Sequence, residues 1–130
     1  MDDLTLVIPA KEEEESLPLV LNEIKNLNLN IIVVLAKDDL KTIDALKNFD
    51  CEILYQNQKG YGNALIQGIN NVKTEYLCIF NADGSFNPKY LSEMLELCKN
   101  RDLVFASRYL KGAGSDDDTI LTKIGNYIFS

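Results

Sequence analysis

The chain contains no histidine and only three cysteines among its 130 residues. The absence of histidine excludes histidine-based catalytic triads, histidine metal sites and histidine general bases. Cys51, Cys78 and Cys98 show no Cys-x-x-Cys spacing, and an odd number of thiols cannot pair completely. We therefore expect reduced, buried thiols of a cytoplasmic protein rather than a disulfide framework.

Long apolar segments are also missing. The longest unbroken apolar run covers residues 31–36, which is far too short to span a membrane. The chain begins Met1-Asp2-Asp3, with no basic region and no apolar stretch, so it does not resemble a signal peptide. These features predict a soluble, cytoplasmic protein that contacts a membrane at most peripherally, at its inner face.

The chain has few positive charges: it contains 13 Lys and Arg residues but 20 Asp and Glu residues, which gives a net charge of -7. Nonspecific nucleic-acid binding requires Lys and Arg to neutralise phosphates, so this class of partner is excluded. The same balance is compatible with metal binding, since clustered carboxylates favour hard cations.

What the chain does have is a regular alternation of strand-like and helix-like segments. Strands are predicted at residues 4–9, 31–35, 51–55, 75–80 and 103–107. Helices are predicted at residues 13–27, 39–49, 60–72 and 88–99, with a last helix that begins near residues 116–118. This alternation predicts a single α/β domain over residues 1–130, with three α/β/α layers and a mostly parallel central sheet.

In such sheets, ligands bind beyond the carboxyl ends of the strands. The polar segments that follow the first four predicted strands should therefore gather at one edge. These segments are residues 11–15, 37–39, 56–62 and 81–85.

The first candidate site lies in the segment that leaves the fourth strand. Asn81 and Asp83 are spaced by one residue, so in an extended segment their side chains share a face. Ala82 and Gly84 leave room for a ligand, and Ser85 adds a hydroxyl. These oxygen ligands suit Mg²⁺ or Mn²⁺ rather than zinc. The alternative is a plain polar turn between a strand and a helix.

The second candidate site is the glycine-containing turn before the third predicted helix. Gly60 and Gly62 allow the backbone to approach a phosphate at the helix N-terminus, and Lys59 adds a point charge. The segment matches neither a Rossmann fingerprint nor a P-loop. The alternative is a glycine turn with a solvated lysine.

Two further segments carry charge that a helix terminus can also explain. Glutamates at residues 12–15 fit the first turn of a helix, although one of them can face a ribose or a nucleobase. Arg108 can clamp a phosphate. Aspartates at residues 116–118 fit an N-cap better than a catalytic base.

Several motifs occur in an order that resembles family 2 glycosyltransferases, of the branch that is similar to dolichyl-phosphate mannosyltransferase. The motifs are VIPAKEE at residues 7–13, NQKGYGNALIQG at 57–68, FNADGSFNP at 80–88, ASRY at 106–109 and GAGSDDDTILTKIGN at 112–126. Each motif is modestly specific, whereas their order and spacing together are strongly specific.

The resemblance implies a GT-A fold, a nucleoside-diphosphate sugar donor, and Mg²⁺ or Mn²⁺ bridging the diphosphate. Its Asp-x-Asp motif corresponds to Asn81 and Asp83, with Asp83 the direct metal ligand and Ser85 a nearby oxygen. The other donor-binding positions that it implies are Pro9, Glu13, Lys59, Gly60, Gly62, Ala82 and Arg108.

The sequence departs from the family pattern in three places. Asn81 stands where the family has aspartate, which predicts weaker metal binding. Residues 35–39 replace an Asp-Asp-Gly-Ser segment that places an acidic group near the nucleobase. Family members also continue beyond Ser130 with much of the acceptor site. The expectation is a chain truncated at its acceptor side, or a homo-oligomer that covers the apolar face of the last helix.

Three functions remain open from the sequence. The first is an inverting hexosyltransferase whose acceptor is a polyprenyl phosphate or a glycan, with Asp117 as the candidate base for a sugar hydroxyl. The second is a non-catalytic nucleotide-sugar-binding module. The third is a receiver-like signalling domain, which requires an aspartate after the third strand where this chain has Tyr55-Gln56-Asn57.

Overall fold

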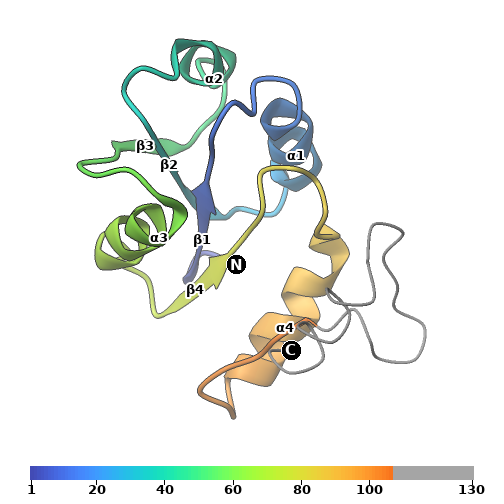
Figure 1. The fold of residues 1–130 in the computed structure, drawn as a ribbon. Helices are drawn as coiled ribbons and strands as arrows, with labels where there is room; N and C mark the ends of the chain where they lie inside the picture. The colour runs from blue at the N-terminus through green and yellow to red at the C-terminus, as the bar shows by residue number, and fades with distance from the viewer. Residues whose placement is uncertain (107–130) are drawn as a thin grey trace, which may run out of the picture. The chain divides into compact units, whose positions relative to one another are not determined.

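The computed structural model describes residues 1–106, and the chain divides into two compact units, Met1–Lys89 and Tyr90–Ser130. The first unit holds a four-stranded sheet and three helices (Figure 1). The strands are β1 (Leu4–Pro9), β2 (Asn30–Leu35), β3 (Glu52–Tyr55) and β4 (Tyr76–Ile79). The helices are α1 (Leu17–Ile24), α2 (Leu40–Ala45) and α3 (Tyr61–Asn70).

The sheet is parallel throughout, in the order β3-β2-β1-β4. The first three strands are therefore added in one direction, from β1 to β2 to β3. The chain then crosses back over the sheet, and β4 pairs with the free side of β1. Right-handed crossovers put α1 and α2 on one face and α3 on the opposite face, as Figure 1 shows. The predicted sheet, with helices on both faces, is confirmed.

The face under α3 is packed closely. Val7, Ile32, Val34 and Ala64 form one buried cluster between β1, β2 and α3. At Gly68 an added Cβ would meet a Val7 methyl group and lie 3.0 Å from a Val34 methyl group, so only glycine lets the helix approach this near.

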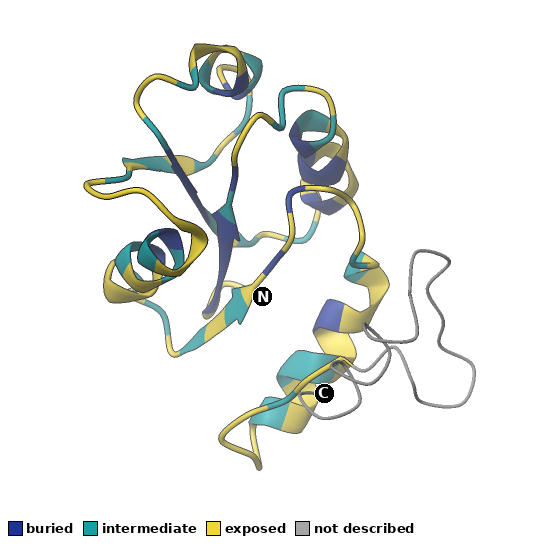
Figure 2. Ribbon diagram, viewed as in Figure 1, coloured by how far each residue is buried: buried dark blue, intermediate teal, exposed yellow. Residues whose placement is uncertain are grey.

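The opposite face is covered by an amphipathic helix. Neighbouring residues of a strand point to opposite sides of the sheet, so Leu6 and Ile8 of β1 face away from α3. Both are fully buried. Helix α1 buries the residues that recur at helical spacing, which are Leu17, Val20, Leu21 and Ile24. Figure 2 shows this buried stripe along α1 and the buried strands at the centre of the unit.

The second unit is described from Tyr90 to Ala106. It contains α4 (Leu91–Cys98), and a 3₁₀ turn, η1 (Pro88–Tyr90), spans the boundary between the units. The fifth predicted strand is wrong for residues 103–106, which form no strand. The predicted last helix lies outside the described residues. No helix within residues 1–106 is long and apolar enough to cross a membrane.

The first predicted helix also begins later than its sequence pattern suggests. Residues 13–16 precede α1, which starts at Leu17. Glu12 has a φ of 53°, outside the right-handed helical region, and the Glu13 amide donates to the hydroxyl of Thr42, 3.1 Å away. Residues 14–16 form a turn, in which the Leu17 amide donates to the Glu13 carbonyl at 3.0 Å, so the regular helix starts about one turn later than predicted.

Candidate functional site

A pocket of about 490 Å³ opens at the carboxyl edge of the sheet, entirely within the first unit. It lies where β1 and β4 are neighbours, which is the point where the strand order reverses. At such a switch point the connections from adjacent strands leave in opposite directions and open a crevice. The lining residues are Pro9, Ala10, Lys11, Glu13, Gln56, Gly60, Tyr61, Ala64, Asn81, Ala82 and Asp83.

Ladder hydrogen bonds beyond the strand ends fix the start of each loop that reaches the pocket. The Ala10 amide donates to the Val34 carbonyl at 2.9 Å, and the Phe80 amide donates to the Val7 carbonyl at 2.9 Å. The Gln56 amide donates to the Leu35 carbonyl at 2.8 Å. The three loops therefore leave the sheet from a common rigid edge.

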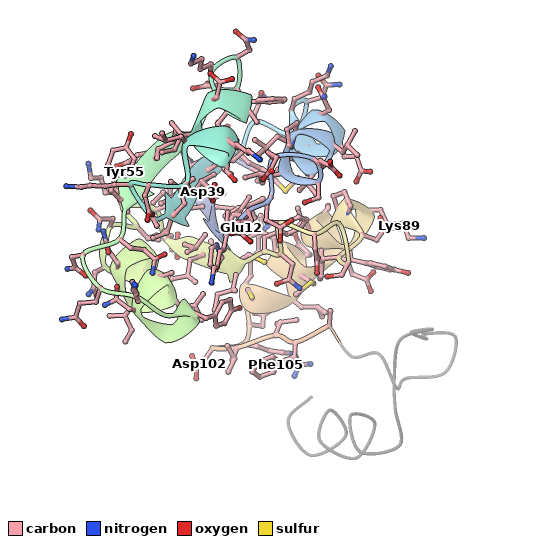
Figure 3. The ribbon with its side chains drawn as sticks, turned by 45° about the horizontal axis from the view of Figure 1, so that its top comes forward. Glu12, Asp39, Tyr55, Lys89, Asp102 and Phe105 are labelled. Carbon is pink, nitrogen blue, oxygen red and sulfur yellow. The ribbon has the colours of Figure 1, made fainter. Side chains whose placement is uncertain are left out.

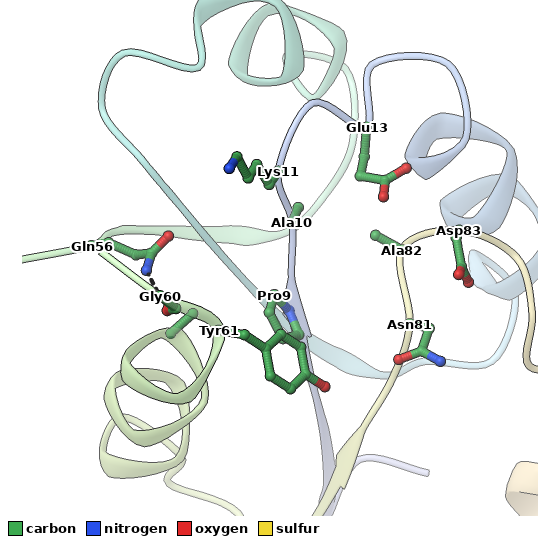
Figure 4. Close-up of a pocket in the computed structure, with 11 residues that line it drawn as sticks. Pro9, Ala10, Lys11, Glu13, Gln56, Gly60, Tyr61, Asn81, Ala82 and Asp83 are labelled. Atoms are coloured by element: carbon green, nitrogen blue, oxygen red, sulfur yellow. Dashed lines mark hydrogen bonds between the residues drawn. The ribbon is translucent and has the colours of Figure 1, made fainter. Parts of the chain in front are cut away.

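The loop after β4 carries the oxygen-bearing side chains. Asn81 Nδ2 donates to Ser85 Oγ at 3.0 Å, and the Ser85 amide donates to Asp83 Oδ1 at 2.9 Å. Gly84 has a φ of 77°, which favours glycine and lets the loop turn back on itself. Figure 4 shows Asn81 and Asp83 on the same side of the loop, with Ala82 pointing toward Ala10.

Aromatic packing holds this loop at its base. Phe80 is buried and makes an edge-to-face contact with Phe86, with ring centroids 5.0 Å apart. Ala82 is buried between its two exposed neighbours. The alternation predicted for Asn81 and Asp83 is therefore present, and both side chains reach the same pocket.

The loop after β3 brings the start of α3 to the pocket. Gly60 has a φ of 110°, a conformation that a residue with a Cβ rarely adopts. The Gln56 side chain donates to the carbonyls of Gln58 and Gly60, each at 3.0 Å. The Gln67 side chain donates to the Tyr55 carbonyl at 2.7 Å. These contacts hold the loop so that the N-terminus of α3 borders the pocket.

The charged groups that line the pocket are Lys11, Glu13 and Asp83, so one ammonium and two carboxylates leave a formal charge of -1. Lys11 and Glu13 extend from the loop after β1 in different directions (Figure 4). Oε2 of Glu13 also accepts a hydrogen bond from the Ser16 hydroxyl. A diphosphate brought into this pocket would require a cation to offset its charge.

Among residues 1–106, no three or more His, Cys, Asp or Glu side chains form a group that could hold a metal ion. Mg²⁺ is commonly bound in proteins through one or two carboxylates together with the phosphates of a substrate. Asp83 supplies one carboxylate, and Asn81 and Ser85 supply neutral oxygens beside it. The donor set is therefore suited to a cation that arrives with a phosphate.

The structure brings together most of the site residues expected from the sequence. Those that line the pocket are Pro9, Glu13, Gly60, Asn81, Ala82 and Asp83. Ser85 contacts Asn81 and Asp83 but does not line the pocket, and neither do Lys59 and Gly62, which are exposed. Arg108 and Asp117 lie outside the described residues.

The segment at residues 56–62 was expected at this edge, and it supplies the pocket residues Gln56 and Tyr61, although neither was singled out as a site residue. The position of Gln56 directly after the third strand was the available signal. The expected segment at residues 37–39 does not line the pocket. Asp39 instead caps α2 by accepting from the Thr42 amide, and it bonds the Glu12 amide at 2.8 Å.

Comparison with known proteins gives one family. Residues 5–129 match the model of glycosyl transferase family 2. An uncharacterized glycosyltransferase of Mycobacterium bovis is 32% identical over 109 residues, which cover 82% of this chain and 49% of that protein. The 2-phospho-L-lactate guanylyltransferase of Methanocaldococcus fervens is 30% identical over 110 residues, covering 82% of this chain and 50% of the relative. The chain thus spans about half the length of these relatives.

Proposed function

Because the chain belongs to glycosyl transferase family 2, we propose that it binds a nucleoside-diphosphate sugar in the switch-point pocket and transfers the sugar to an acceptor. Its parallel sheet with helices on both faces is the GT-A fold of that family. The observation that carries the proposal is the convergence of three loops on one pocket, which joins Glu13, Gly60 and Asp83.

Each loop has a distinct role in this proposal. Pro9 and Glu13 line the nucleoside end of the donor. Gly60 and the N-terminus of α3 face the diphosphate, because the first amides of a helix and its dipole favour anions. Lys59 and Gly62 lie beside this turn, where Lys59 adds positive charge near the phosphates.

Asp83, Asn81 and Ser85 are the residues that would hold Mg²⁺ or Mn²⁺. Such an ion, when bound, supplies positive charge to the departing nucleoside diphosphate as a Lewis acid. The chain's own contribution is to fix the direction of the Asp83 carboxylate through the Ser85 amide. Asn81 keeps the loop compact and adds no further negative charge beside the phosphates.

The transfer is proposed to invert the anomeric centre. An acceptor oxygen attacks the anomeric carbon as the bond to the diphosphate oxygen breaks, and the nucleoside diphosphate leaves with the electron pair. In the branch similar to dolichyl-phosphate mannosyltransferase the acceptor is a polyprenyl phosphate, whose oxygen is already anionic. A glycan hydroxyl would instead need a base, for which Asp117 is the candidate, and Arg108 would contact a phosphate.

A second function is favoured by one observation. The loop after β4, which would hold the metal ion, carries a single carboxylate, because Asn81 stands where the family has an acidic residue. This arrangement also suits a module that binds a nucleotide sugar without transferring it. A turnover assay separates the two functions, since donor binding without transfer or donor hydrolysis supports the module.

The proposed function is tested by a thermal-shift screen of UDP-, GDP- and CDP-sugars with and without Mn²⁺. Binding to the native state raises the melting temperature by mass action. GTP belongs in the screen because one relative is named a guanylyltransferase. We expect a shift with one nucleotide sugar that depends on Mn²⁺. The absence of any shift across the screen would contradict the proposal.

A further inference from the structure

The loop after β1 holds an unusual backbone conformation beside the pocket. Glu12 has a φ of 53°, and non-glycine residues with positive φ are uncommon. Such a conformation persists only where its surroundings determine it. The residues on either side, Lys11 and Glu13, both line the pocket. Whatever holds Glu12 therefore also sets one wall of the pocket.

The start of α2 supplies that hold. Asp39 Oδ2 accepts from the Glu12 amide at 2.8 Å, and Thr42 Oγ1 accepts from the Glu13 amide at 3.1 Å. Asp39 Oδ1 also accepts from the Thr42 amide at 3.4 Å, which joins the two acceptors to each other. Thr42 is fully buried. Figure 3 shows Glu12 and Asp39 close together.

We propose that Asp39 and Thr42 are positioning residues, which set the donor-binding wall formed by Lys11 and Glu13 without touching the donor. This inference rests on the proposed function of the pocket. Neither residue lines the pocket, and the Asp39 carboxylate already binds two backbone amides. Its role in this proposal is therefore to shape the loop after β1 rather than to contact the donor.

The test compares two variants at each position, one that removes the hydrogen-bond acceptor and one that keeps an acceptor. Asp39→Ala removes both acceptors, whereas Asp39→Asn keeps one amide oxygen. Thr42→Val removes the hydroxyl at nearly constant shape, whereas Thr42→Ser keeps it. Asp38→Asn is the charge control, because Asp38 is exposed and does not line the pocket.

Two quantities are measured on each variant, at a temperature where circular dichroism shows it folded. The first is the Kd of the Mn²⁺ complex of the nucleotide sugar that the thermal-shift screen identifies. The second is the hydrogen-exchange rate of the peptide amides at residues 10–16 without donor. A role confined to folding would lower stability but would leave the Kd of the folded protein unchanged.

We expect Asp39→Ala and Thr42→Val to raise the Kd about tenfold and to speed exchange, because small displacements of positioning groups are costly. Asp39→Asn and Thr42→Ser should stay within about threefold of the native Kd, since each retains an acceptor. An unchanged Kd in both Asp39→Ala and Thr42→Val, or unchanged exchange, overturns the inference. If the native protein binds no nucleotide sugar while Asp39→Ala still speeds exchange, the proposed function fails although the contact between α2 and the loop is real.

Discussion

The carboxyl edge of the sheet carries a pocket of about 490 Å³, whereas the amino edge carries one of about 260 Å³. At the amino edge, hydrogen bonds join segments far apart in the chain. The Thr5 and Thr74 hydroxyls lie 2.6 Å apart, and the Asn30 side chain donates to the Asp2 carbonyl at 2.8 Å. These bonds tie the strand entrances together.

At the carboxyl edge the loop after β1 is held by Asp39 and Thr42 from the start of α2, whereas the side-chain hydrogen bonds of the loops after β3 and β4 are mostly local. Gln56 bonds the carbonyl of Gly60, and Asn81 and Asp83 both bond Ser85. The loops after β3 and β4 are therefore ordered by local contacts, and the pocket lies between these loops and the loop after β1. Two polar pockets at opposite edges of one sheet thus differ in construction, and we expect binding at the carboxyl edge and stability at the amino edge.

The largest expected effect tests the carboxyl edge directly. Asp83→Asn retains an acceptor for the Ser85 amide and removes the charge that would hold the cation. We expect the Mn²⁺-dependent affinity for the nucleotide sugar to fall at least about 100-fold, since even residues that merely orient metal ligands contribute about 10- to 100-fold. Isothermal titration calorimetry with and without Mn²⁺ measures the change.

Asp38→Asn is the matched control for that variant, because it removes an equal charge from an exposed side chain that does not line the pocket. It should bind as the native protein does. Equal affinities for Asp83→Asn and the native protein would remove the carboxyl edge as the donor site.

The second prediction concerns the packing of α3 against β1 and β2. Gly68→Ala places a methyl group against Val7 and Val34, both buried on β1 and β2. Overpacking of this kind costs about 1–3 kcal/mol, so the free energy of unfolding should fall by that amount. Urea denaturation followed by circular dichroism measures it.

Gly62→Ala is the control in the same helix, because an added Cβ there meets nothing within 4 Å. Its free energy of unfolding should stay at the native value or rise slightly, since alanine is the better helix former. A loss in Gly62→Ala equal to that in Gly68→Ala would mean that close packing is not the cause.

Sequence pattern predicted the architecture well because burial on both faces produces continuous apolar strands such as residues 31–35. It was less accurate at the element ends. The glutamates before α1 were expected to lie in the helix, but residues 14–16 form a turn, with the Leu17 amide bonded to the Glu13 carbonyl, and the regular helix starts at Leu17. The apolar residues 103–106 look like a strand but form none in the structure.

The sequence predicted which loops form the candidate site, but not every residue that lines it. Asn81 and Asp83 were expected to converge because the alternation of an extended chain is a local property. Tyr61 lay in the segment expected at this edge but was not singled out, because its place at the pocket depends on where α3 begins relative to β1, which sequence spacing does not encode. Asp39 was expected among the residues near the ligand. It instead accepts hydrogen bonds from the amides of Glu12 and Thr42, which lie 27 and 3 residues away along the chain.

A third, smaller effect is expected at the amino edge. Thr74→Val removes the hydrogen bonds of the Thr74 hydroxyl to Thr5 and to the Tyr76 carbonyl. Stability should fall by about 1–2 kcal/mol, because the buried Thr5 hydroxyl loses its partner. Donor affinity should stay within about twofold of the native value, because Thr74 does not line the carboxyl-edge pocket and distant sites act independently. A large loss of affinity with unchanged stability would reverse the contrast between the edges, and Thr74→Ser should behave as the native protein.

The smallest effect concerns the thiol that lines the amino-edge pocket. Burial raises the pKa of Cys51 above its ordinary value of 9.0, and the nearby negative charge of Asp50 raises this pKa further. The thiolate is the reactive form, so alkylation of Cys51 by iodoacetamide should require a higher pH in the folded chain than in urea. Mass spectrometry of the Cys51 peptide gives the alkylation rate at each pH.

The control variant is Asp50→Asn. It should shift the pH dependence of the alkylation rate toward lower pH, but by less than unfolding does, because burial is the larger cause of the raised pKa. If Asp50→Asn restored the unfolded profile completely, the charge of Asp50 rather than burial would be the main cause of the raised pKa of Cys51.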